Sequence, residues 1–267
     1  MDAPFFHKYT PQPMHPVSPS YIDPQIMQRS LTAYHKNPLY LYVKKLFGEE
    51  SAHRLFLLYN VGTSSKWNGS TVYWQVDMEG RVHTGKVMRY DAQTGHRVKE
   101  PHGYVSWAHA ELQLKDFHLQ QCLFGEHLLS QSSSSRVILV ESEKTAIIGK
   151  HFLPEYIWLA TGGKNGCFNS SAVQCLKGRS VLLIPDLGAT EDWKKKMDIL
   201  LPICLDVKIS DVLEEEATDE QRARGLDIAD FLLMEETPGR ILEKMKAKNP
   251  NLQLLIDTLG LELVEEQ

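Results

Sequence analysis

Two acidic residues stand directly after apolar runs, where a carboxylate is well placed for chemistry. Glu141 follows the run 137–140, and Asp186 follows the run 181–185. Short runs rich in β-branched residues are typical of buried strands. Ligands of open α/β sheets bind beyond the carboxyl ends of parallel strands. We therefore expect both acids at one edge of one sheet, where carboxylate oxygens suit Mg²⁺, with Mn²⁺ as an alternative.

A third apolar run, 157–160, ends in a glycine pair. Gly162, Gly163 and the following Lys164 form a loop whose backbone N–H groups are able to face a phosphate. The loop is not a Walker A motif, because Gly-x-x-x-x-Gly-Lys-Ser/Thr does not occur in the chain. We predict phosphate or nucleotide binding by these three residues, and a simple tight turn is the alternative.

The residues around both acids resemble a known family. Val-Glu-Ser-Glu-Lys-Thr-Ala at 140–146 resembles the first motif of the Toprim domain, which bacterial-type primases, phage primase-helicases, topoisomerases and some nucleases share. The run ending at Asp186 resembles the second motif, and 226–232 resembles the acidic segment that follows in primases. The resemblance implies that Glu141 is a general acid or base and that aspartates bind Mg²⁺. Lys144 begins the next helix, where it meets a phosphate or pairs with Glu141.

The chain departs from the family at one position. The second Toprim motif usually reads Asp-x-Asp, and here Gly188 stands in place of its second aspartate. The missing ligand would come from Asp192, Asp227 or Asp230. We predict Asp186, Asp227 and Asp230 as the metal ligands, since the last two lie three residues apart on one helix face. Asp227 also suits the N-cap of that helix, and this interpretation is slightly favoured.

The resemblance implies a primase-like Toprim protein that performs Mg²⁺-dependent nucleotidyl or phosphoryl transfer on single-stranded DNA. Its expected partners are single-stranded DNA, nucleotides and a helicase or other replication protein, in replication or mobilisation of a genetic element. Two alternatives stay open. One is a catalytically reduced Toprim module that binds nucleic acid or a replication partner without turnover, which Gly188 favours; the other is a Toprim nuclease.

The N-terminal residues are rich in proline. Residues 7–11 resemble the tail of a zinc-ribbon module that precedes the Toprim region in related proteins from Bacteroidetes mobile elements. A disordered tail is the alternative. The four cysteines form no CxxC pair, so the sequence predicts neither a zinc ribbon nor a disulfide framework within this chain.

The first half of the chain carries basic and aromatic residues on an expected antiparallel meander. Side chains of two kinds alternate along the chain from Thr71 to Asp77, as expected of a strand. The chain turns at Glu79-Gly80, and a second alternating stretch runs to Met88. Basic groups interleaved with aromatic rings suit phosphate contact and base stacking. The predicted nucleic-acid contacts are Arg81, Lys86, Arg89, Arg97, Lys99 and Trp74. The alternative is a solvated sheet face with the aromatic residues in the core.

Charge is distributed unevenly along the chain. Residues 1–131 carry 13 Lys and Arg against 11 Asp and Glu, a net charge of +2, whereas residues 132–267 carry 16 against 23, a net charge of −7. Contact with a polyanion is therefore expected in the first half. No stretch approaches the roughly 18 apolar residues that a membrane span requires, so we expect a cytoplasmic protein without a membrane partner.

The predicted fold class is α/β. We expect a Pro-rich extended arm over 1–24, an α+β primase-like domain over 25–131, and a Toprim-like domain with a Rossmannoid parallel sheet and C-terminal helices over 132–267. The boundary rests on the serine run 130–135. The expected helices are 24–34, 37–47, 51–58, 116–129, 143–150, 170–175, 191–200, 227–234, 238–247 and 251–263.

Overall fold

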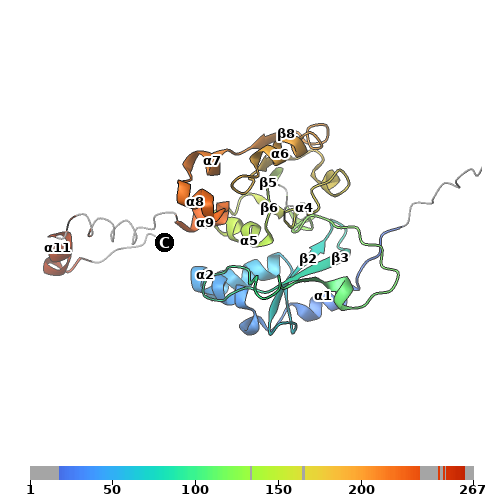
Figure 1. The fold of residues 1–267 in the computed structure, drawn as a ribbon, viewed down its shortest axis with the longest axis horizontal. Coiled ribbons are helices and arrows are strands. Elements are labelled where there is room, and N and C mark those ends of the chain that lie inside the picture. Colours follow the sequence, from blue (N-terminus) through green and yellow to red (C-terminus); the bar gives the residue numbers. More distant parts are fainter. Residues whose placement is uncertain are drawn as a thin grey trace, which may run out of the picture. The chain divides into compact units, whose positions relative to one another are not determined.

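The computed structural model describes residues 18–132, 134–163, 166–234, 246, 249 and 251–261. The chain divides into two compact units, one ending at Gln131 and the other beginning at Ser132, which Figure 1 colours from blue to green and from green to red. The helix expected over 238–247, apart from residue 246, lies outside the described residues, as do Lys164 and residues 1–17 of the expected arm.

The first unit is built on an antiparallel meander. Its strands are β1 (Val61–Ser64), β2 (Ser70–Val76), β3 (Val82–Met88) and β4 (Val105–Trp107), each paired with the next. The turn between β2 and β3 forms because the Asp77 carboxylate accepts the N–H groups of Glu79 and Arg81. Gly80 in this turn has a φ of +80°, which glycine adopts without strain. The predicted meander is confirmed.

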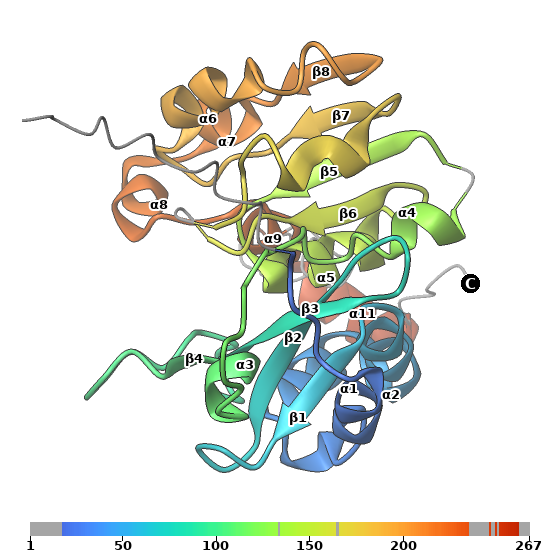
Figure 2. The same ribbon diagram turned by 90° about the vertical axis from the view of Figure 1, so that its right-hand side faces the viewer.

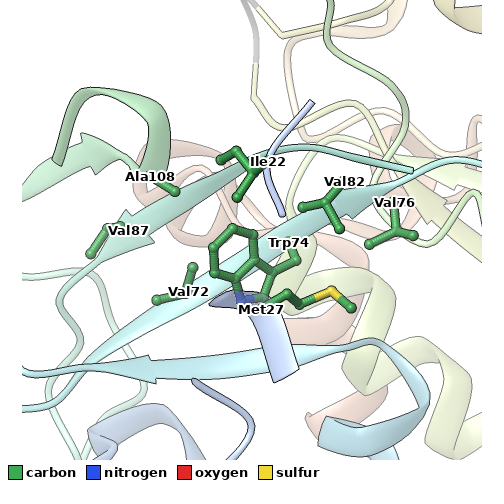
Figure 3. Packing of buried hydrophobic residues seen from close by; sticks show 8 residues of the cluster. All are labelled: Ile22, Met27, Val72, Trp74, Val76, Val82, Val87 and Ala108. Atoms are coloured by element: carbon green, nitrogen blue, oxygen red, sulfur yellow. The ribbon is translucent and has the colours of Figure 1, made fainter. Parts of the chain in front are cut away.

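Both faces of the central strands β2 and β3 are buried. Figure 3 shows one face, where side chains gather around the Trp74 indole; the cluster is Ile22, Met27, Val72, Trp74, Val76, Val82, Val87 and Ala108. On the other face, the ring of Tyr73 meets those of Phe124 and Tyr90 edge-on. The meander therefore presents no open face along these two strands.

Helices precede and follow these strands along the chain. They are α1 (Pro24–Ser30), the 3₁₀ helix η1 (Tyr34–Lys36), α2 (Pro38–Leu58), α3 (Ala108–Glu111) and α4 (Leu128–Gln131). Asn37 caps α2, as its side chain accepts the N–H groups of Leu39 and Tyr40. The two helices expected over 37–47 and 51–58 are one element kinked at Gly48, whose φ is +82°.

The helix predicted over 116–129 is wrong. Only Leu128–Gln131 is helical there, and Asp116 has a φ of +51°. The consecutive residues Leu123 and Phe124 are both fully buried. A surface helix buries one stripe of residues, so an irregular segment satisfies this burial better than a helix does.

The second unit contains a four-stranded parallel sheet (Figure 2). Its strands are β5 (Arg136–Val140), β6 (Ile157–Ala160), β7 (Ser180–Leu183) and β8 (Asp206–Ile209), in the order β6-β5-β7-β8. Val137 to Val140 are fully buried, which explains the continuous apolar run. Leu139 of β5 pairs with Leu183 of β7, so both strands end at the same edge. The predicted α/β fold with a parallel sheet is confirmed.

The helices of the second unit are α5 (Glu143–Phe152), the 3₁₀ helix η2 (Ala172–Leu176), α6 (Thr190–Met197), α7 (Val212–Glu216), α8 (Asp219–Arg224), α9 (Ile228–Met234) and α11 (Asn251–Leu259). The helix expected over 170–175 is a 3₁₀ helix, and the helix expected over 191–200 ends at Met197. Within the described part of the chain, no helix is both long and apolar enough to span a membrane.

Candidate active site at the carboxyl edge of the parallel sheet

Asp186 lies just beyond the end of β7 and is partly buried. Burial, together with the negative charges of Asp227, Glu141 and Asp230, raises the pKa of Asp186 to about 8, and the positive charge of Lys144 acts in the opposite direction. A side chain perturbs a pKa in this way only when it is close. The structure therefore brings these five ionisable groups, all proposed from the sequence, into one neighbourhood.

Asp227 is fixed by three hydrogen bonds. Its Oδ1 accepts the N–H of Asp230 at 3.0 Å, while Asp230 Oδ2 accepts the N–H of Asp227 at 3.1 Å, so the pair caps α9 reciprocally. The Thr145 hydroxyl on α5 donates to Asp227 Oδ2 at 2.7 Å. The expected N-cap is present. A carboxylate offers about four lone pairs, so capping leaves Asp227 able to accept further contacts.

The donor set of this neighbourhood suits a hard cation. The groups that act on Asp186 are carboxylates and one lysine, with no histidine or cysteine. Across the described residues, no three His, Cys, Asp or Glu side chains are arranged to hold a metal ion. Mg²⁺ is usually bound by one or two carboxylates completed by water and substrate phosphates, so it does not require such a triad. The residues present therefore fit Mg²⁺ in ligand type, through Asp186 and Asp227.

The glycine pair after β6 positions Glu141. The N–H groups of Gly162 and Gly163 both donate to the Glu141 carbonyl oxygen, at 3.0 and 2.9 Å, and both glycines have positive φ. Neither N–H is free to face a phosphate, so the structure contradicts the predicted phosphate contacts of this pair. A Cβ on Gly162 would lie 3.4 Å from Oε1 of the buried Glu143. The loop thus holds the backbone of the proposed acid or base in place.

The Glu214 side chain is hydrogen-bonded to the loop after β7, and no feature of the sequence identified it as a site residue. Its Oε1 accepts the N–H of Gly188 at 2.8 Å and the hydroxyl of Thr190 at 3.3 Å. Its Oε2 accepts Arg222 Nη1 at 2.6 Å. Glu214 belongs to the acidic triplet 214–216 at the end of α7. Asp192, by contrast, is exposed and lies 3.8 Å from Lys195.

Two of the predicted nucleic-acid contacts belong to the interior of the first unit. Trp74 is 3% exposed, and its indole N–H donates to Ser30 Oγ at 2.8 Å. Lys86 is 8% exposed. A base cannot stack on a buried indole, so the structure contradicts the prediction for Trp74, and burial argues equally against phosphate contact by Lys86.

The remaining basic residues differ in how they are engaged. Arg81 forms ion pairs with Asp77 at 2.6 Å and Glu79 at 2.9 Å. Arg89 is partly buried, and its guanidinium lies 5.1 Å from the centre of a tyrosine ring. Arg97 and Lys99 are exposed. The basic groups best placed for a phosphate in solution are therefore Arg97 and Lys99.

The fold of the chain is that of primase catalytic cores. It is similar to the RNA polymerase domain of Mycobacterium tuberculosis primase DnaG, with a TM-score of 0.50 and 10% identity over 79% of this chain and 77% of that one. The same domain in complex with double-stranded DNA gives a TM-score of 0.51 and 11% identity over 79% of this chain and 75% of that one. The E. coli primase catalytic core gives a TM-score of 0.47 and 13% identity, covering 91% and 98%. At these identities the likeness concerns the fold alone.

Residues 37–187, more than half of the chain, match the model of the domain of unknown function DUF6371. The chain therefore belongs to the DUF6371 family. No curated protein matches it.

Proposed function

We propose that this protein is a primase-like nucleotidyl transferase that uses Mg²⁺ and acts on single-stranded DNA, in the replication or mobilisation of a genetic element. The observation that carries the proposal is the pKa of Asp186, which burial and three neighbouring acids raise to about 8. Carboxylates gathered where a sheet ends, with strongly perturbed pKa values, are frequent in active sites. The primase-like fold supports the same function.

Asp186 and Asp227 would hold the cation. Between them they would place a positive charge that offsets the negative charge developing during phosphoryl transfer. Burial, together with the acids around it, raises the pKa of Asp186 to about 8, so Asp186 must release a proton to become a ligand. The hydroxyl of Thr145 holds Asp227 by one carboxylate oxygen and so limits its rotation.

Glu141 would transfer the proton of the reacting hydroxyl. Its backbone is fixed by the N–H groups of Gly162 and Gly163, and a fixed carboxylate near the reacting hydroxyl is able to accept its proton in the transition state. Lys144 lies close enough to Asp186 to lower its pKa, so its ammonium is placed to meet a nucleotide phosphate in the same neighbourhood. These assignments make Glu141 and Lys144 the proposed catalytic residues.

Arg97 and Lys99 would contact the DNA backbone, because exposed cations bind phosphates and release counterions. The primase domain that is similar at a TM-score of 0.51 is in complex with double-stranded DNA, which supports DNA as the ligand. A helicase or other replication protein is the proposed protein partner.

Primer synthesis on a single-stranded template with nucleoside triphosphates and Mg²⁺ tests the proposal. The wild-type chain should synthesise primers. Glu141→Gln should reduce the rate of primer synthesis by about 100-fold or more, since general acid–base catalysis contributes about 10²–10⁴-fold. Glu155→Gln, which neutralises an exposed carboxylate, is the matched control and should be as active as wild type. Equal rates for the Glu141 and Glu155 variants would remove Glu141 from the mechanism, and nicking of plasmid DNA would instead assign the site to a nuclease.

Gly188 supports a second candidate, a reduced module that binds nucleic acid or a replication partner without turnover. Glycine stands where the Toprim motif has its second aspartate, and among the residues that the structure describes no three-ligand group is formed. Calorimetry separates the two candidates. The enzyme should bind Mg²⁺ at millimolar concentration, whereas the binding module should retain affinity for single-stranded DNA with no metal binding.

A further inference from the structure

Three hydrogen-bonded partners of Glu214 come from two parts of the second unit. Its Oε1 accepts the Gly188 N–H at 2.8 Å and the Thr190 hydroxyl at 3.3 Å, both from the loop between β7 and α6 and its junction with α6. Its Oε2 accepts Arg222 of α8 at 2.6 Å, and Arg222 Nη2 also donates to the Glu214 carbonyl oxygen. We call these four residues the Glu214 clamp.

The clamp is stronger than an isolated surface ion pair. The Glu214 side chain is 30% exposed and the Arg222 side chain 39%. Hydrogen bonds to a charged group are about twice as strong as those between neutral groups. The Gly188 N–H, followed by Arg222 and Thr190, holds the pKa of Glu214 below its ordinary value against the effect of burial, so the carboxylate is charged at neutral pH.

The clamp acts on the segment that carries Asp186. The loop closes on itself, because the Ala189 N–H donates to the Asp186 carbonyl oxygen at 2.9 Å. Gly188 lies inside this turn with a φ of +80°, and its N–H is the atom that Glu214 holds. The hydrogen bond to the Gly188 N–H therefore restrains the turn that carries the Asp186 side chain.

The other end of the clamp leads to Asp227. Arg222 lies in the last turn of α8, whose C-cap is Gly225 in the left-handed conformation. Leu226 follows and is 4% exposed, and Asp227 comes directly after it. The clamp thus joins the turn that carries Asp186 to the helix that directly precedes the Asp227 segment.

We propose that Glu214 is a positioning residue, whose clamp holds the Asp186 turn against the Asp227 segment so that both carboxylates are preorganised for one divalent cation. The inference rests on the proposed function for the cation itself, but the positioning of the turn does not depend on it. Preorganised ligands bind a metal more tightly than ligands that must first be brought together, and supporting contacts of this kind are worth about 10–100-fold in affinity.

Hydrogen exchange at the Gly188 amide tests the positioning without any metal. Glu214→Ala should speed this exchange by about tenfold or more, because the charge-assisted hydrogen bond to this amide is removed. Glu214→Gln retains an oxygen that accepts from Gly188 and should exchange more slowly than Glu214→Ala. The control is Glu215→Ala, which removes an exposed carboxylate of the same helix and should leave the exchange unchanged. Equal exchange in the Glu214→Ala and Glu215→Ala variants would overturn the positioning role.

Mg²⁺ affinity, measured by calorimetry, tests the consequence. Glu214→Ala should weaken binding by about tenfold or more, Glu214→Gln should weaken it less, and Glu215→Ala should leave it unchanged. Arg222→Ala should weaken binding by an intermediate factor because only one half of the clamp is removed. Faster exchange at Gly188 with unchanged Mg²⁺ affinity would refute preorganisation of the cation site. If the wild-type chain bound no Mg²⁺, the proposed function would fail, and the exchange experiment would still decide whether Glu214 holds the turn.

Discussion

Replacing Asp186 with asparagine should stabilise the metal-free protein, increasingly so as the pH rises. The ordinary pKa of this carboxyl is 3.8, and burial with the charges of Asp227, Glu141 and Asp230 raises it to about 8. Between these values the folded protein keeps a proton that the unfolded chain has released. The folded state therefore binds more protons, and its stability falls as the pH rises through this window. Asparagine has the same shape and never ionises, so it removes this decline.

The size of the effect follows from the two pKa values. Each unit of pKa is worth 1.36 kcal/mol, so Asp186 costs the folded state about 3 × 1.36, or roughly 4 kcal/mol, at pH 7 relative to pH 4. This is an upper value, because water and the neighbouring side chains relax around a charge. We expect Asp186→Asn to gain at least about 1 kcal/mol over wild type between pH 5 and pH 7.

Urea unfolding in the presence of a chelator measures the difference at each pH. Asp206→Asn is the control, because it removes the same charge from an exposed position on β8 of the same unit. The difference between the Asp186 variant and wild type should grow with pH, and that of the Asp206 variant should stay flat. Saturating Mg²⁺ should then stabilise wild type and not the Asp186 variant, by about 2.7 kcal/mol at 100 times the Kd. A pH-independent difference for Asp186→Asn would refute the clustering of acids.

Three further predictions concern other parts of the chain. Gly162→Ala and Gly178→Ala both place a Cβ at positive φ and should each cost about 1–2 kcal/mol of stability. Only the Gly162 variant should slow primer synthesis, because the Gly162 N–H donates to the Glu141 carbonyl oxygen and the Gly178 N–H donates to that of Ile203; equal rates would contradict the role of the glycine pair. Trp74→Phe should leave the affinity for single-stranded DNA unchanged in a binding assay, because the indole is buried; a clear drop in affinity would mean that this face opens. Replacing Arg97 and Lys99 together with alanine should weaken single-strand binding and reduce the salt slope by about 0.7 for each phosphate that the protein no longer neutralises, and an unchanged slope would place the DNA elsewhere.

The centre of the parallel sheet was predictable because β6 and all but the first residue of β5 are buried. The apolar runs 137–140 and 181–185 predict β5 and β7 to within two residues at each end, since a strand in a covered parallel sheet is mostly apolar. The same reasoning placed the site at the carboxyl edge of the sheet, because neighbouring parallel strands end at the same edge. Sequence reasoning therefore placed Glu141 and Asp186 beyond the ends of adjacent strands.

The residues that were predicted wrongly or not at all depend on partners far away in the sequence. Trp74 and Lys86 lie in strands covered on both sides, by residues such as Met27 on one face and Phe124 on the other, and no local pattern indicates that cover. Glu214 acts through an N–H 26 residues away, which a stretch of glutamates does not reveal.

The same holds for the glycine pair after β6. Its N–H groups face the Glu141 carbonyl oxygen rather than a phosphate, because β5 and β6 are neighbours in the sheet. A glycine pair in sequence specifies backbone freedom and leaves open which acceptor the freed N–H groups meet.

The central claim is that the carboxylates beyond the ends of β5 and β7 share one divalent cation. A crystal structure of the protein soaked with Mn²⁺, with an anomalous difference map, tests this most directly. We predict a peak that contacts carboxylate oxygens of both Asp186 and Asp227, at about 2.0–2.3 Å. A map with no peak near Asp186, or with Mn²⁺ bound only at other residues, would contradict the account.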